Sequence, residues 1–233
     1  MNDPIEPRTL GLVAGLGVGA GIFYYRALVA AHRARGLSPG ILMAHADVRR
    51  VVGLAQAREA AELAAYLNGL LRQLAAGGAQ VAVIPAFAPQ ICARELAGLS
   101  PLPLIGLLDA IAAEVERRGL RRIAIFGARV TMETKLFGGL PEIEVAALTA
   151  QELDLVSSIY GQIVEHESAS REEEQTLRDL AHRLIDRERL DAILLAGTDL
   201  AFVFHPDNTD FPHVDGARIH IEAILREVIP GGG

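Results

Sequence analysis

The stretch TLGLVAGLGVGAG, residues 9–21, decides the fold class, because an apolar run passes directly into a glycine-rich turn. Residues 9–14 are typical of a buried strand, and residues 22–35 beyond the turn have the composition of a helix. Strand, turn and helix in this order form the repeating unit of parallel α/β sheets. The stretch therefore predicts an α/β protein.

The same alternation continues along the rest of the chain. Further strands are expected at residues 41–44, 79–84, 122–126, 143–146 and 191–196, and helices at 60–74, 89–96, 109–118, 132–137, 172–185 and 216–228. The repeat predicts parallel sheets, and the comparable stretches 83–90 and 194–200 suggest two pseudo-symmetric α/β domains. We expect the first domain at residues 1–102, completed by a C-terminal helix within 209–233, and the second at 103–208.

Bulk composition excludes several classes of function. A net charge of −7 and 5% aromatic residues give no basic surface and few stacking platforms, so nucleic acid is not an expected partner. No apolar run approaches the roughly 20 residues of a membrane span, and the polar start does not resemble a signal peptide. We expect a cytoplasmic protein without a membrane partner. The single cysteine, Cys92, excludes internal disulfides and thiolate-rich metal sites, and is expected in the core.

Ligands of open parallel sheets bind beyond the carboxyl ends of the strands. Gly17 and Gly19 follow the first strand, where backbone N–H groups suit a small carboxylate or phosphate. The spacing of Gly15, Gly17 and Ala20 also fits a relaxed dinucleotide fingerprint. The acidic residue that such a site needs about 20 positions later is absent, which favours the simpler anion site.

Titratable side chains follow two of the expected strands. His45 and Asp47 point to the same side by alternation, either as a general base with its carboxylate or as a structural hydrogen bond. Asp199 follows Thr198 just after the last expected strand and is the best-placed carboxylate for catalysis, with capping of the next segment as the alternative. Arg49 and Arg50 either bind a distal substrate carboxylate or are solvated.

Other polar residues are candidates for substrate contact or for metal binding. Thr131 and Glu133 open an expected helix, where Thr131 is either a donor to substrate or the helix N-cap. A loop rich in His and Asp has metal-ligand residue types without a tight metal-binding pattern, so no metal is expected. Its residues are His205, Asp207, Asn208, Asp210, His213 and Asp215.

Motifs spread over nearly the whole chain resemble those of the aspartate/glutamate racemase superfamily. They are the glycine turn with Tyr24-Tyr25, Pro103-Leu104-Ile105-Gly106 before Asp109-Ala110, the loop 127–133, Gly197-Thr198-Asp199, and Val214-Asp215 to Arg218-Ile219-His220. The resemblance implies two pseudo-symmetric α/β domains with parallel sheets and a ligand cleft between them. It also implies a homodimer that acts on a small carboxylate-bearing molecule without pyridoxal phosphate, metal or other cofactor. Inversion of a stereocentre needs a base on one face and an acid on the other, and in that family both are cysteines.

The resemblance places both family thiols at positions that hold no thiol in this chain. The first falls on Ala86, or on Pro85 in a register shifted by one, and the second falls on Gly197. Phe87 stands where the family has an Asn that binds the substrate carboxylate, whereas Thr198 keeps its counterpart. The lone cysteine lies about two helical turns beyond Ala86 and is not expected to reach the cleft.

Three functions are consistent with these residues. The first is a cofactor-independent isomerase, or a related lyase or decarboxylase, acting at a carbon next to a carboxylate with Asp199, His45 and Asp47 as non-thiol acid/base groups. The alternative is an inactive protein of the same fold that binds or senses a small carboxylate. The third is an ordinary aspartate/glutamate racemase, which the substituted thiol positions argue against.

Overall fold

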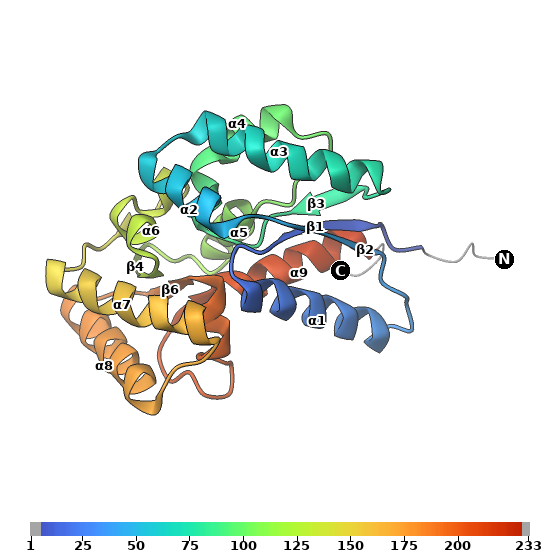
Figure 1. Ribbon diagram of the computed structural model, residues 1–233. Helices are drawn as coiled ribbons and strands as arrows, with labels where there is room; N and C mark the ends of the chain where they lie inside the picture. Colours follow the sequence, from blue (N-terminus) through green and yellow to red (C-terminus); the bar gives the residue numbers. More distant parts are fainter. Residues whose placement is uncertain (1–5, 230–233) are drawn as a thin grey trace. The chain divides into compact units, whose positions relative to one another are not determined.

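The structure is a computed structural model that describes residues 6–229. Two parallel sheets with helices between their strands confirm the predicted α/β class (Figure 1). The chain divides into two compact units: unit 1 contains the residues up to 107 together with those from 220 onward, and unit 2 contains residues 108–219. Residues 1–5 and 230–233, which the predicted first domain includes, lie outside the described part.

Unit 1 is built on a three-stranded parallel sheet of order β2-β1-β3. Its strands are β1 (Leu10–Ala14), β2 (Ile41–His45) and β3 (Val81–Val83). The helical elements are α1 (Val18–Ala34), α2 (Val48–Ala57), α3 (Ala60–Ala76), the 3-10 helix η1 (Ala88–Cys92), α4 (Ala93–Leu99), and α9 (Gly216–Val228), whose first turn belongs to unit 2. In the register Leu12 lies beside Met43 on one side and Val83 on the other, so the three strands end at one edge.

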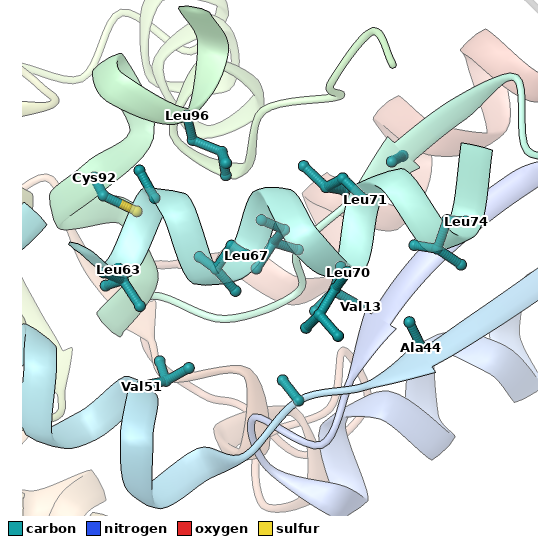
Figure 2. Close-up of a cluster of buried hydrophobic side chains, with 14 of the residues drawn as sticks. Val13, Ala44, Val51, Leu63, Leu67, Leu70, Leu71, Leu74, Cys92 and Leu96 are labelled. Carbon is teal, nitrogen blue, oxygen red and sulfur yellow. The ribbon is translucent and has the colours of Figure 1, made fainter. Parts of the chain in front are cut away.

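Helix α3 supplies much of the core of unit 1. Its leucines recur at helical spacing and are buried: Leu63, Leu67, Leu70, Leu71 and Leu74. Burying a leucine side chain contributes roughly 1.5–3 kcal/mol, so this face alone fixes the helix against its neighbours. Cys92 is fully buried in the same cluster, and Figure 2 shows its side chain at the end of α3 that carries Leu63. The prediction of a core cysteine is therefore confirmed.

Unit 2 is built on a four-stranded parallel sheet of order β5-β4-β6-β7. Its strands are β4 (Arg122–Gly127), β5 (Glu144–Val145), β6 (Ala192–Ala196) and β7 (His213–Asp215). The helical elements are α5 (Leu107–Arg117), α6 (Arg129–Glu133), η2 (Leu136–Gly138), α7 (Ala150–His166), α8 (Arg171–Glu188) and η3 (Thr198–Phe202). Strand β7 pairs with β6, so residues 213–215 lie in the sheet of unit 2, although we placed 209–233 with the first domain.

Several expected element bounds differ from the structure for identifiable reasons. Helix α1 begins at Val18 rather than at residue 22, because the later glycines of the turn are already helical. The expected helix 132–137 is replaced by the shorter α6, after which Lys135, Leu136 and Phe137 take positive φ values that stop a right-handed helix. The strands expected at 79–84 and 143–146 are shorter, as β3 and β5.

Helix α7, which was not predicted from the sequence, is stabilised at its start by a capping box. The Thr149 hydroxyl accepts a hydrogen bond from the Glu152 backbone N–H, and the Glu152 carboxylate accepts one from the Thr149 N–H. Helix α8 repeats the arrangement with Ser170 and Glu173. Within residues 6–229, no helix combines the length and apolar character needed to cross a membrane.

Candidate functional site

The carboxyl end of β6 in unit 2 carries a buried carboxylate. The strand is apolar throughout and continues into Gly197, after which η3 begins with Thr198 and Asp199. Asp199 has 1% of its surface exposed and Thr198 has 2%. The phenol of Tyr160, on α7, donates a hydrogen bond to Oδ2 of Asp199 over 3.3 Å, and the Thr198 hydroxyl lies 3.5 Å from the same oxygen.

Tyr160 is held in this position by close packing against the backbone. A Cβ atom built on Gly197 would lie 2.2 Å from Cε2 of Tyr160, a distance that side-chain carbons do not adopt. Position 197 is therefore closed to any side chain while the ring is there. Burial, the negative charge of Asp199 and the hydrogen bond to it raise the pKa of Tyr160 well above its usual value, so the phenol is neutral at physiological pH.

The neighbouring strand β4 brings a second set of polar residues to the same edge. Its last residue, Gly127, packs so closely on β6 that a Cβ there would lie 2.3 Å from the Ala196 carbonyl oxygen. Thr131 is fully buried, and its hydroxyl has no hydrogen-bond partner among the described residues. Ala128, not Thr131, is the N-cap of α6, so the capping alternative for Thr131 is wrong.

Glu133 belongs to an exposed ion-pair network beside this edge. Its carboxylate accepts a hydrogen bond from Arg129 over 3.0 Å, and Arg129 also pairs with Asp154 of α7. Glu133 also lines a recess of about 230 Å³ next to β5. A larger recess of unit 2, about 590 Å³, is bordered by residues 119–121 and 140–143, which precede β4 and β5. It therefore lies at the amino edge of the sheet, opposite Asp199.

In unit 1, Asp47 serves as a helix cap. Its carboxylate accepts hydrogen bonds from the backbone N–H groups of Arg49 at 2.9 Å and Arg50 at 3.3 Å, and its own N–H donates to the Tyr66 hydroxyl at 2.7 Å. His45 is exposed at the end of β2. The Asp47 carboxylate is thus hydrogen-bonded to the start of α2. This is the structural role that we gave as the alternative to a pair with His45.

The glycine turn after β1 lies against His45. Gly15 has a φ of 86°, and a Cβ there would lie 2.9 Å from both Cε1 and Nε2 of the His45 ring. Gly17 is the N-cap of α1 with a φ of 139°, and Gly19 is buried in the first turn of the helix. The structure therefore brings the turn and His45 together at the carboxyl edge of β1 and β2.

The two arginines after β2 differ in their surroundings. Arg49 is exposed and supplies its backbone N–H to the Asp47 cap. The guanidinium of Arg50 lies 4.5 Å from the centre of the Tyr66 ring and 3.9 Å from a Glu62 carboxylate oxygen. Of the two, Arg49 has its side chain directed to solvent without such contacts in the described residues.

The carboxyl end of β3 is apolar. Ala86 and Phe87 are both buried, and the Ala86 carbonyl accepts a hydrogen bond from the Gln90 side chain at 2.9 Å. The Cys92 thiol donates to the Pro89 carbonyl at 3.1 Å, and burial raises its pKa to about 12. This thiol stays protonated near neutral pH and has no access to a ligand.

The His- and Asp-rich loop is held together by its own hydrogen bonds and ion pairs. Asp210 pairs with Arg178 at 2.6 Å and with His182 at 3.3 Å, and Asn208 accepts the His205 N–H at 2.6 Å. Across residues 6–229, no three His, Cys, Asp or Glu side chains gather as a metal-binding group.

Tyr160 is the site residue that the sequence did not reveal. It lies next to Val156, Ile159 and Ile163, which form the buried stripe of α7. A tyrosine beside an apolar stripe is typical of an ordinary core position. Only the approach of α7 to η3 shows that its hydroxyl meets Asp199.

Comparison with known proteins places this architecture in a family. The model of the Asp/Glu/Hydantoin racemase family matches residues 13–224, and a search of curated proteins gives no match. Among solved structures, a Yersinia pestis protein described as of the Asp/Glu racemase type is similar with a TM-score of 0.80 and 23% identity, over 93% of this chain and 97% of that one. An aspartate racemase homologue from Pyrococcus horikoshii OT3 gives 0.77 and 18%, over 94% and 97%. Unliganded arylmalonate decarboxylase gives 0.55 and 17%, over 97% and 94%. At these identities the structural likenesses show the fold, while the family match spans most of the chain. The chain belongs to the Asp/Glu/hydantoin racemase family.

Proposed function

We propose that the protein is a cofactor-independent enzyme that acts at a carbon next to a carboxylate of a small acidic molecule, with non-thiol acid/base groups. The observation that carries the proposal is the buried Asp199 carboxylate at the carboxyl end of β6. A buried titratable group at the edge where parallel sheets bind ligands is typical of a functional site. Family membership supports the reaction class, an isomerase or a related lyase or decarboxylase.

Each unit supplies groups suited to a substrate carboxylate. The unpartnered Thr131 hydroxyl and the Thr198 hydroxyl are donors in unit 2. In unit 1, the backbone at Gly17 and Gly19 opens a 17-residue helix whose N-terminus favours negative charge. Arg49, Phe87 and Glu133 remain proposed substrate contacts. Glu133 would contact the substrate while it is paired with Arg129.

His45 is the proposed acid/base group of unit 1. It is exposed beside the glycine turn at the carboxyl end of β2, and an imidazole ring has one nitrogen that can accept a proton and one that can donate it. Asp47, the third proposed group, caps α2 through its carboxylate. Because it lies between His45 and this helix, its contribution is to hold the end of β2 in place.

The proposal is tested by hydrogen exchange at carbon. The protein is incubated in D2O with a panel of amino acids and 2-substituted acids, and deuterium next to the carboxylate is measured by NMR. We expect incorporation with at least one acid, and its loss in Asp199→Asn. Asp207→Asn, which changes an exposed carboxylate in the following loop, is the matched control and should keep the wild-type rate. No exchange with any acid would contradict the proposal.

A catalytically inactive protein that binds or senses a small carboxylate is the second candidate. It is favoured by the carboxyl end of β3, where Ala86 and Phe87 are apolar and buried. Such a protein would gain thermal stability from a dicarboxylate that stays unchanged on long incubation, and Asp199→Asn would still bind it. Chemical change of the ligand would count against this function.

An ordinary aspartate/glutamate racemase with two thiols is the third candidate, and Cys92 argues against it. One cysteine cannot act on both faces of a stereocentre, and this one is buried. The proposal also includes a cytoplasmic homodimer, for which light scattering should give twice the chain mass of 24.9 kDa.

A further inference from the structure

The phenol head of Tyr160 occupies the space in which a side chain at position 197 would begin. Relative to a Cβ atom built on Gly197, Cε2 of the ring lies at 2.2 Å and Cζ at 2.6 Å. With Cδ2 at 3.0 Å, these atoms form one edge of the ring, and Cζ is the carbon that carries the hydroxyl. Position 197 directly follows β6, at the carboxyl edge of the sheet.

The hydroxyl is hydrogen-bonded to a carboxylate that is itself buried. Tyr160 donates to Oδ2 of Asp199 at 3.3 Å, and Asp199 lies between other buried residues of η3. A phenol and a carboxylate joined in this way share a proton path, because each is the other's hydrogen-bond partner. The pair is therefore suited to proton transfer between the phenol and the carboxylate.

A separate observation indicates that a ligand belongs near this edge. Thr131 follows the adjacent strand β4, is fully buried, and has a hydroxyl without a partner among the described residues. Buried hydroxyls are almost always hydrogen-bonded, so an unpaired one calls for a group that the protein does not supply. A carboxylate oxygen of a substrate is such a group.

We propose that Tyr160 is the catalytic residue of unit 2, and that Asp199 is a positioning residue that exchanges protons with it. This inference rests on the proposed function. In the forward step the substrate C–H bond breaks, its electron pair stays on the carbon, and the proton forms a bond to the Tyr160 oxygen. At the same time the phenol proton passes to the Asp199 carboxylate. The reverse step returns a proton to carbon by the same path, so atoms and charge balance.

The state of the phenol agrees with this relay. Burial and the Asp199 charge keep Tyr160 protonated, so it cannot act alone as a phenolate base. By passing its proton to Asp199 as it receives one, it avoids placing two negative charges side by side. Gly197 is required because any side chain there would displace the ring.

The first test is Tyr160→Phe, which keeps the ring and removes the hydroxyl. We expect deuterium incorporation to fall at least about 100-fold, while the substrate acid still raises the melting temperature. Tyr25→Phe, at an exposed tyrosine of α1, is the matched control and should exchange at the wild-type rate. If the wild type exchanges and the rate of Tyr160→Phe is within threefold of the wild-type rate, the inference is overturned and the proposed function stands. Absence of exchange in the wild type would instead reject the proposed function.

The second test separates the relay from a structural role of Asp199. Asp199→Glu keeps a carboxylate and should retain measurable exchange, whereas Asp199→Asn cannot take a proton and should retain none. The pH profile of exchange in Asp199→Glu should shift relative to the wild type, because the proton acceptor has changed. Equal activity of Asp199→Asn and Asp199→Glu, or an unchanged profile, would count against the relay.

Discussion

The hydroxyl of Tyr24 lies 3.1 Å from Nδ1 of His220, joining α1 to α9 inside unit 1. The other ring nitrogen, Nε2, lies 2.9 Å from the Ile105 carbonyl oxygen and donates to it, so Nδ1 accepts from the tyrosine. Both side chains are fully buried. The imidazole is thus neutral and satisfied on both sides, and its place is structural.

This pair predicts that the protein loses stability in mild acid. Burial lowers the pKa of His220 from 6.5 to about 4, so the unfolded chain binds a proton more readily than the fold does. The free energy of unfolding therefore keeps the full contribution of the neutral His220 above pH 6.5. It falls as the pH drops towards 4, by up to roughly 3 kcal/mol. Urea unfolding at pH 7.5 and 4.5 should show this loss. His220→Gln should reduce the pH dependence, whereas His166→Gln, at an exposed site, should keep it.

Removing the tyrosine hydroxyl should destabilise the same pair at neutral pH. Tyr24→Phe leaves Nδ1 of His220 buried without this donor, which costs about 1–3 kcal/mol in the free energy of unfolding. Its sequence neighbour Tyr25 is exposed, so Tyr25→Phe should change stability by less than about 0.5 kcal/mol. Chemical denaturation of the two variants compares a buried with an exposed hydroxyl on one helix, and equal effects would contradict the assigned hydrogen bond.

The buried thiol predicts resistance to thiol reagents. Cys92 is inaccessible and its pKa is raised to about 12, so iodoacetamide at pH 8 should leave the folded protein unmodified. In urea the thiol should alkylate fully, as mass spectrometry would show. Carbon exchange in Cys92→Ala should match the wild type. A loss of exchange in that variant would return the cysteine to the mechanism.

Two glycines should respond in opposite ways to substitution by alanine. Gly15 has a positive φ, and a Cβ there would lie 2.6 Å from the Ala46 carbonyl oxygen, so Gly15→Ala should cost roughly 2 kcal/mol or more. Gly53 lies inside α2 with nothing within 4 Å of its Cβ position. Gly53→Ala should therefore stabilise the fold by about 0.5–1 kcal/mol. Thermal denaturation of the two variants gives the signs directly.

Sequence periodicity was sufficient to predict the helices and strands that have strong apolar patterns. The leucines of α3 and the run Ala192–Ala196 of β6 have the spacing of a buried helix face and a buried parallel strand, and both elements are observed. Strand β7 gave no such signal, because three residues are too few for a period to be recognised. Helix α7 was also missed, although its capping box of Thr149 and Glu152 is a recognisable start.

The site could be predicted only in part for a different reason. Residues directly after strands, such as His45 and Asp199, follow from the rule that ligands bind at the carboxyl edge. Tyr160 lies 39 positions before Asp199 and reaches it through the packing of α7, which local sequence does not encode. The capping role of Asp47 was equally hidden, since alternation along β2 assumes that the strand continues past His45, where it ends.

Helix α9 passes from unit 2 into unit 1, and this has a consequence for the order of folding during synthesis. The three strands of unit 1 are complete once residue 83 has been made, but His220 is made only after the whole of unit 2. Until then, the Tyr24 hydroxyl and the Ile105 carbonyl lack the hydrogen bonds that they form with the His220 imidazole in the folded protein. Unit 1 therefore cannot complete its hydrogen bonding until the residues of unit 2 have been synthesised.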